Sequence, residues 1–399
     1  MKDTYRKLLA ECEGARAVNT HCHHLPDGFQ QGQTLDILLE NSYAAWNGLT
    51  PGRTSESRDD YCRQLRATAS FHWLEKGLQR LCGMDAPLCA ATWDAYDAKV
   101  RALTADAGFH LRALREDCGY DRVILDSLAP CGRQETDETL FVPTYRVNMF
   151  LFGYGNDAKD HNGRHPLACC GWDRMPGSYP EFLAAVRNEI RMAKDRGAVA
   201  LKSALAYDRG QRFLPVSPEQ AAAGYRNPEA SPEDVIRFQD GVFREICAAA
   251  GETGLPLQVH TGLGLLKDSA AMQLRDLIAD YPGTRFVLFH GSFPWTQDVV
   301  ALARTFQNVY ADLCWLPLLS AAACESLLRE LLESVTPLRL AWGCDTWHSF
   351  ESLGARMAMN HVLAKTLSGL IDEGRIDPAQ AEYVIGCVLK EGAKRCYGL

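Results

Sequence analysis

The sequence predicts an α/β fold, a (β/α)8 TIM barrel with a mostly helical insertion after the first strand. Eight short apolar or β-branched runs follow one another along the 399 residues, and amphipathic helical stretches separate the later runs. Several of these runs end in histidine, lysine or aspartate. Because catalytic side chains of a barrel lie at the C-terminal ends of its strands, such endings predict one shared site.

The first expected strand, residues 15–20, leads directly into His21 and His23. Alternate residues of a strand face the same side, so the two imidazoles can converge on one metal ion. An isolated pair of this kind is more often two hydrogen-bonded histidines in a loop, so the metal reading depends on the later strands. We assign residues 1–24 to the first barrel strand and this metal motif.

Residues 25–119 are expected to form a mostly helical insertion, or lid, able to cover the site. Helix-like apolar spacing occurs at residues 35–43, 61–81 and 91–114. The stretch 47–59 contains Pro51 and Gly52 and is predicted to be an exposed loop.

Residues 120–399 are expected to supply the rest of the barrel and the C-terminal helices. The predicted strands are residues 122–126, 145–150, 198–202, 255–260, 284–290, 308–313 and 338–345. The predicted helices between them are residues 180–196, 231–254, 269–281, 296–307 and 321–335, with helical periodicity again over 349–399.

Four later strands end in ionisable residues, namely Lys202, His260, His290 and Asp345. Burying such a side chain among apolar neighbours costs several kcal/mol unless it is paired or binds an ion, so their recurrence at the same strand end favours a site.

The combined pattern resembles the amidohydrolase superfamily, most closely the amidohydrolase-2 group and more distantly the uronate isomerases. The resemblance lies in the two histidines after the first strand and in the motifs QVHTG, LFHGSFPW, WGCDTW and GAKRCYGL. It covers the barrel but not residues 25–119. It implies metal ligation by His21, His23, His260 and Asp345, and catalytic roles for Asp345 and His290.

Two positions have more than one reading under this resemblance. His290 either holds a second metal or polarises the substrate, and we favour the second role. Lys202 is a metal ligand if carbon dioxide carboxylates it, as in the binuclear members. Otherwise it lies outside the metal shell or pairs with a barrel carboxylate.

This ligand set suits one or two Zn²⁺ ions, although other divalent transition metals could occupy it. The expected reaction is hydrolysis of an amide, lactone or ester of a small substrate by a metal-activated water. Asp345 would transfer the proton, while His290 and the ion would stabilise the oxyanion. The alternatives are a sugar-acid isomerase or lyase that uses the same site, and a barrel that only binds ligands.

Several other side chains are candidates for substrate binding. Trp295, Trp315, Trp347 and His348 follow strand ends and could wall a pocket, although aromatic residues there are commonly packing residues. Arg209 could clamp a substrate carboxylate, or be an ordinary surface arginine.

The composition argues against several classes of protein. A net charge of −8 and a pI near 5.8 disfavour a nucleic-acid partner. No apolar run is long enough to span a membrane. Fifteen cysteines, odd in number and without a CxxC pair, favour a reducing cytoplasm. A small-molecule substrate is the expected partner, and homo-oligomerisation is left open.

Overall fold

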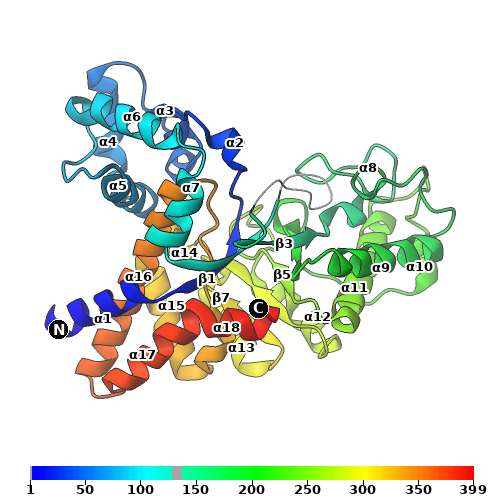
Figure 1. Ribbon diagram of the computed structural model, residues 1–399. Helices are drawn as coiled ribbons and strands as arrows, with labels where there is room; N and C mark the ends of the chain where they lie inside the picture. The colour runs from blue at the N-terminus through cyan, green and yellow to red at the C-terminus, as the bar shows by residue number, and fades with distance from the viewer. Residues whose placement is uncertain (1, 128–136) are drawn as a thin grey trace.

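The computed structural model describes residues 2–127 and 137–399, and it is organised around eight parallel strands (Figure 1). The strands pair in sequence order, each with the next. They are β1 (Ala17–Cys22), β2 (Tyr120–Leu125), β3 (Phe141–Arg146), β4 (Ala200–Ser203), β5 (Leu257–Val259), β6 (Phe286–Leu288), β7 (Val309–Asp312) and β8 (Leu340–Ala341). The predicted TIM-barrel fold is confirmed as a nearly closed barrel.

Backbone hydrogen bonds join the first strand to the segment that follows the last one. The Thr20 N–H donates to the carbonyl of Trp342 at 3.2 Å, and the Asp345 N–H donates to the carbonyl of His21 at 2.9 Å. The His23 N–H then donates to the carbonyl of Thr346 at 3.0 Å. These bonds place the histidine pair beside Asp345, 322 residues later in the sequence than His23.

Amphipathic helices cover the outside of the barrel, as the sequence pattern predicts. In α9 (Tyr179–Asp195) the buried residues Phe182, Val186 and Ile190 recur every four positions and so form one face. The Ser178 hydroxyl caps its first turn by accepting the Glu181 N–H. The other barrel helices are α11 (Pro232–Thr253), α12 (Arg275–Asp280), α13 (Thr296–Thr305), α15 (Ala321–Ser334), α16 (Ser349–Asp372), α17 (Pro378–Gly386) and α18 (Gly392–Tyr397).

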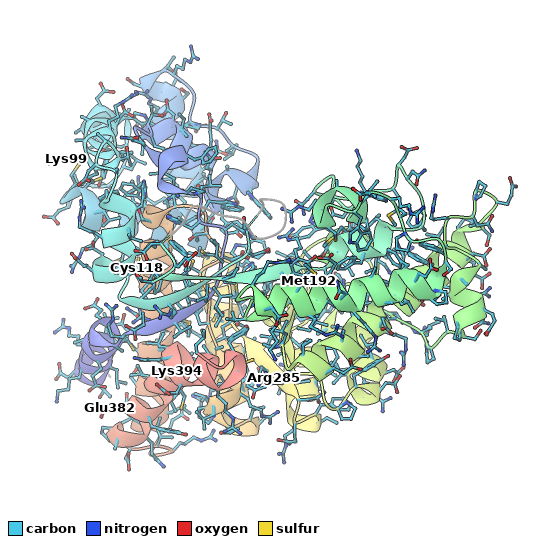
Figure 2. The ribbon with its side chains drawn as sticks, turned by 45° about the vertical axis from the view of Figure 1, so that its right-hand side comes forward. Lys99, Cys118, Met192, Arg285, Glu382 and Lys394 are labelled. Carbon is cyan, nitrogen blue, oxygen red and sulfur yellow. The ribbon has the colours of Figure 1, made fainter. Side chains whose placement is uncertain are left out.

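Helices also dominate the segment between β1 and β2, which has a hydrophobic cluster of its own. This segment contains α2 (Asp27–Gln30), α3 (Leu35–Glu40), the 3-10 turn η1 (Tyr43–Asn47), α4 (Ser55–Leu65), α5 (Ala69–Cys82), α6 (Ala90–Thr104), α7 (Phe109–Arg112) and the π turn η2 (Ala113–Asp117). In Figure 2 it stands apart from the α9 side of the barrel, with Lys99 on α6 facing outward. Its boundaries as a separate unit stay a prediction.

Two glycines allow this helical segment to pack closely on the barrel, where α5 contacts α16. A Cβ added to Gly77 would lie 2.1 Å from the carbonyl oxygen of Phe350, and one added to Gly354 would lie 2.3 Å from that of Trp73. Any side chain at either position would push the two helices apart.

The third strand and the N-terminus differ from the sequence expectations. The strand expected at residues 145–150 lies at Phe141–Arg146, and Asn148–Phe152 forms a 3-10 turn, because a short apolar run fits either structure equally well. An unexpected helix, α1 (Lys2–Gly14), precedes the barrel and buries Leu8 and Cys12 despite its charged outer face.

Part of the stretch 47–59, expected to be a loop, is helical because α4 begins at Ser55. The Thr54 hydroxyl caps that helix. Among the described residues, no helix is both long and apolar enough to cross a membrane.

Candidate metal centre

Backbone strain is concentrated where the strands end at the barrel mouth. His290, Trp315 and Asp345 follow β6, β7 and β8 and have φ values of 63°, 63° and 60°. Residues other than glycine in this left-handed region cost about 1–3 kcal/mol each and persist where the surrounding fold imposes them, commonly at functional sites.

Three side chains converge at one point of this mouth. The Nε2 atoms of His21 and His23 each lie 3.3 Å from Oδ1 of Asp345. Ligand atoms about 2.0–2.1 Å from a tetrahedral zinc ion lie about 3.3 Å from one another, so the spacing fits a shared cation. Asp345 Oδ1 is buried without a hydrogen-bond donor, as expected for an atom that needs a metal.

The ionisation states of these groups also suit a cation. Burial, with nearby Lys202, lowers the pKa of His21 to about 3, so its imidazole is neutral. Burial alone would raise the pKa of Asp345, but His21 and His23 hold that pKa well below its usual value. A neutral imidazole such as that of His21 and an ionised carboxylate are the forms that bind metal.

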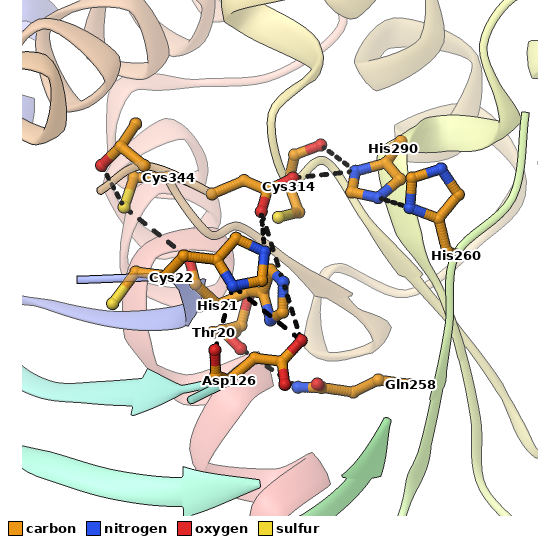
Figure 3. Close-up of polar contacts among 12 residues, drawn as sticks. Thr20, His21, Cys22, Asp126, Gln258, His260, His290, Cys314 and Cys344 are labelled. Atoms are coloured by element: carbon orange, nitrogen blue, oxygen red, sulfur yellow. Dashed lines mark hydrogen bonds and ion pairs between the residues drawn. The ribbon is translucent and has the colours of Figure 1, made fainter. Parts of the chain in front are cut away.

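Asp126 supports the histidine pair from behind. The His23 Nδ1–H donates to its backbone carbonyl at 2.9 Å, which leaves Nε2 of His23 with a free lone pair. The Asp126 carboxylate receives two hydrogen bonds from Arg146. Burial would raise the pKa of Asp126, but Arg146 and then His23 outweigh it and the pKa is lowered. In Figure 3 Asp126 lies next to His21.

His260 and His290 form a separate pair on the other side of the mouth (Figure 3). His290 Nε2 lies 2.9 Å from His260 Nδ1. The remaining nitrogens contact backbone carbonyls, His290 Nδ1 that of Cys314 at 3.1 Å and His260 Nε2 that of Leu263. Burial lowers the pKa of His290 to about 4 and that of His260 well below its ordinary value. All four ring nitrogens therefore already have a neighbour in the protein.

Lys202 lies between these two groups in a buried position. Its Nζ is 4.1 Å from the ring centroid of Phe289. Burial lowers the pKa of Lys202, against the opposing effect of Asp126 and Asp345.

A cavity of about 250 Å³, which we call the inner cavity, opens over these side chains. Of the residues singled out in the sequence, six line it, namely His21, His23, Lys202, His260, Asp345 and Trp347. The other residues that line it are Tyr43, Trp46, Arg146, His161, Asn162, Ala204 and Tyr207.

The remaining predicted residues lie away from this lining. Arg209 forms an ion pair with Asp240 at 2.7 Å and lies over the ring of Phe213, so its carboxylate partner belongs to the protein. His348 is buried and caps α16, where its Nδ1 accepts the Glu351 N–H. Trp295 is a 38% exposed residue that precedes α13. His290 contacts His260, and its Nδ1 lies 3.8 Å from Oδ2 of Asp345, while Trp315 lines a neighbouring cavity.

The structure adds three groups that sequence reasoning missed. Asp126 ends an expected strand, so the rule applied to the other strands could have found it. Arg146 ends β3 and was hidden by the misplaced strand boundary. His161 lies in a loop without periodicity, and its Nδ1–H donates to Oδ2 of Asp208 at 2.8 Å, a contact that only the tertiary fold creates.

Comparison with known proteins agrees with this geometry. Residues 172–359, from the end of α8 (Pro166–Cys170) into α16, match the family model described as amidohydrolase. This part of the chain is similar to the amidohydrolase family. The resemblance inferred from the motifs is thereby confirmed, although the histidine pair at 21 and 23 lies N-terminal to the matched region.

One curated relative is protein fluG of Emericella nidulans, which is 38% identical over 239 residues. The match covers 55% of this chain but only 27% of fluG, so the chain spans about a quarter of that relative's length.

Several solved structures share the fold over nearly the whole chain. The uronate isomerase of Thermotoga maritima is 16% identical, with a TM-score of 0.78 over 99% of this chain and 97% of its own. The glucuronate isomerase of Caulobacter crescentus is 18% identical, with a TM-score of 0.74 over 100% and 94%. A Lactobacillus casei protein, provisionally assigned as a metal-dependent hydrolase, is 17% identical, with a TM-score of 0.70 over 98% and 97%. At these identities the likeness shows the fold alone.

Proposed function

We propose that the protein is a divalent-metal-dependent hydrolase that acts on an amide, lactone or ester carbonyl of a small substrate. The observation that carries the proposal is the convergence of His21 and His23 on Oδ1 of Asp345 beside the inner cavity. This oxygen is buried and accepts no hydrogen bond. The match of residues 172–359 to the amidohydrolase family model supports it.

His21, His23 and Asp345 would hold the cation. A bound divalent ion supplies Lewis-acid polarisation of a carbonyl and makes water more acidic. Zn²⁺ suits two imidazoles and a carboxylate, although other divalent transition metals accept the same donors.

The chain's own residues supply proton transfer and positioning. Asp345 is held ionised. Its carboxylate can therefore accept a proton from the water that attacks the carbonyl and return that proton to the leaving group. Lys202 and Arg146 line the same cavity and can stabilise negative charge on the substrate. The indole of Trp347 stacks on His23, with ring centroids 5.8 Å apart, and covers the ligand from solvent.

The test combines metal analysis with a hydrolysis panel. The purified protein, loaded in turn with Zn²⁺, Mn²⁺ and Fe²⁺, is assayed with aryl esters, γ-lactones and N-acyl amino acids in ¹⁸O-labelled water. We expect metal-dependent turnover that places one labelled oxygen in the product. A protein that binds about one equivalent of metal yet hydrolyses none of these classes would contradict the proposal.

A sugar-acid isomerase or lyase is the second candidate. Lys202 lines the inner cavity and could bind a uronate carboxylate, with Arg146 beside it in its ion pair with Asp126. Two of the similar structures are described as uronate and glucuronate isomerases. Incubation with D-glucuronate in deuterated water tests this reading, because isomerisation predicts a ketose product and redistribution of hydrogen between adjacent carbons.

A further inference from the structure

A second and larger cavity adjoins the inner one. This outer cavity has a volume of about 1020 Å³, and Tyr43, Trp46 and Tyr207 line both cavities. The two spaces therefore meet at these three aromatic side chains. A substrate whose reacting end lies beside Asp345 can extend past them into the outer cavity.

The two cavities differ in charge. Ionisable side chains dominate the inner cavity, including Arg146, Lys202 and Asp345. The described residues that line the outer cavity include no Asp, Glu, Lys or Arg. Because a charged group loses hydration in a cavity that offers no opposite charge, the outer cavity suits an uncharged group.

Aromatic rings form the wall between the two cavities. The ring centroid of Trp46 lies 5.1 Å from that of Tyr43 and 5.4 Å from that of Trp315, and both pairs are edge-to-face. Although it belongs to this cluster, Trp46 is 59% exposed, so much of its indole has no protein neighbour. An aromatic or apolar ring placed against it would remove that surface from water.

The helical insertion supplies half of this outer wall. Its contribution comes from η1 and from the start of α5, residues 67–73. The barrel supplies the opposite wall through the loops after β4, β5 and β7 and through His361 on α16. In Figure 1 the insertion lies over α14 (Leu316–Leu319) and α16, and α5 contacts both helices.

We propose that the outer cavity binds an uncharged, ring-bearing portion of the substrate, with Trp46 as its main contact. The inference rests on the proposed function for the position of the reacting carbonyl. It makes the insertion the part of the chain that selects substrates, while the barrel holds the reacting groups.

The test compares three hydroxamates, whose common head group binds divalent metals, by calorimetry on the zinc-loaded full-length protein. Acetohydroxamate fills only the inner cavity, 4-phenylbutanohydroxamate adds an uncharged ring, and 6-aminohexanohydroxamate adds a charged tail. We expect the phenyl compound to bind at least about tenfold more tightly than acetohydroxamate, because its ring is removed from water. The amino compound should show no gain.

Two variants test whether Trp46 causes the higher affinity of the phenyl compound. Trp46→Ala should abolish most of the difference in affinity between the phenyl compound and acetohydroxamate, whatever its effect on acetohydroxamate itself, and the exposed position of Trp46 makes misfolding a small risk. Phe29→Ala is the matched control, since Phe29 is a 77% exposed aromatic of the same insertion outside both linings. It should change neither affinity.

A ligand without a metal-binding head separates this inference from the proposed function. N-benzylacetamide, titrated by tryptophan fluorescence with and without zinc, should bind weakly but saturably to the wild type and less well to Trp46→Ala. If no hydroxamate binds but N-benzylacetamide does, the metal assignment fails and the outer site stands. The outer site is overturned if N-benzylacetamide does not bind, if the charged tail gains as much as the ring, or if Trp46→Ala keeps the gain.

Discussion

The two sides of the barrel mouth use the same residue type in different ways. His21 and His23 direct their Nε2 atoms at one carboxylate oxygen, and His23 keeps a free lone pair there, whereas the nitrogens of His260 and His290 contact each other and backbone carbonyls. Both pairs lie at the ends of apolar strands, His21 and His23 at one strand and His260 and His290 at two neighbouring strands. The difference shows that a strand-end histidine becomes a candidate ligand only when its neighbours leave a nitrogen unoccupied.

The largest expected effect concerns the carboxylate between the two sides. Asp345→Asn keeps an oxygen ligand but cannot carry a proton as a carboxylate does. We expect turnover to fall about 10²–10⁴-fold while bound metal stays near the wild-type level. Steady-state kinetics with the best substrate of the panel, together with metal analysis by mass spectrometry, measures both. Wild-type turnover would remove Asp345 from proton transfer.

Zinc affinity tests whether the two histidine pairs differ as metal ligands. His23→Ala should cost at least about 100-fold in zinc affinity, while His260→Ala should cost less than about tenfold, because the structure engages both nitrogens of His260 elsewhere. Competition with a fluorescent chelator gives the two affinities. His165→Asn serves as the control, since His165 caps α8 outside both cavities and asparagine retains the cap. Equal losses for His23→Ala and His260→Ala would make His260 a ligand after all.

A variant of Arg146 tests whether its ion pair with Asp126 holds His23 in place for metal binding. Arg146→Met leaves the Asp126 carboxylate buried without its cation and should destabilise the fold by about 3–5 kcal/mol. Arg209→Met, which also breaks a buried ion pair but lies away from the inner cavity, is the matched control. Both variants should lower the free energy of unfolding in urea, but only Arg146→Met should also weaken zinc binding, by about 10–100-fold.

The smallest expected effect concerns Asp312, which links the two sides. Its carboxylate accepts the Thr20 hydroxyl at 2.7 Å, beside the histidine pair, and the Cys314 N–H at 2.9 Å, beside His290. Burial raises the pKa of Asp312 to about 7 from an ordinary value of 3.8. The folded state therefore binds the Asp312 proton more tightly than the unfolded state does. As a result, the contribution of Asp312 to the free energy of unfolding falls as pH rises from about 4 to 7.

Asp312→Asn removes that pH-dependent cost. We expect the free energy of unfolding of the variant to exceed that of the wild type by about 1–3 kcal/mol at pH 8 and by almost nothing at pH 4. Denaturant unfolding of both proteins at the two pH values measures the difference. A gain of equal size at both pH values would show that the effect comes from packing and not from ionisation.

The sequence predicted more of the barrel than of the site. Hydrophobic periodicity depends on local burial, so it located all eight strands to within a few residues except the third. It also placed the ionisable strand ends at one mouth, because that placement follows from parallel strands in a closed ring. It failed at Arg146 because the run 145–150 is equally apolar as a strand or as a 3-10 turn.

The sequence by itself determined the fold class, the family resemblance and the strand-end residues, since these follow from local pattern and motif. Only the tertiary structure decided that Nε2 of His23 is free while both nitrogens of His260 are engaged, that Asp126 and Arg146 lie behind His23, and that Arg209 pairs with Asp240. It alone also revealed an uncharged cavity between the insertion and the barrel. Such features depend on distances between residues far apart in the chain, and no local pattern encodes those distances.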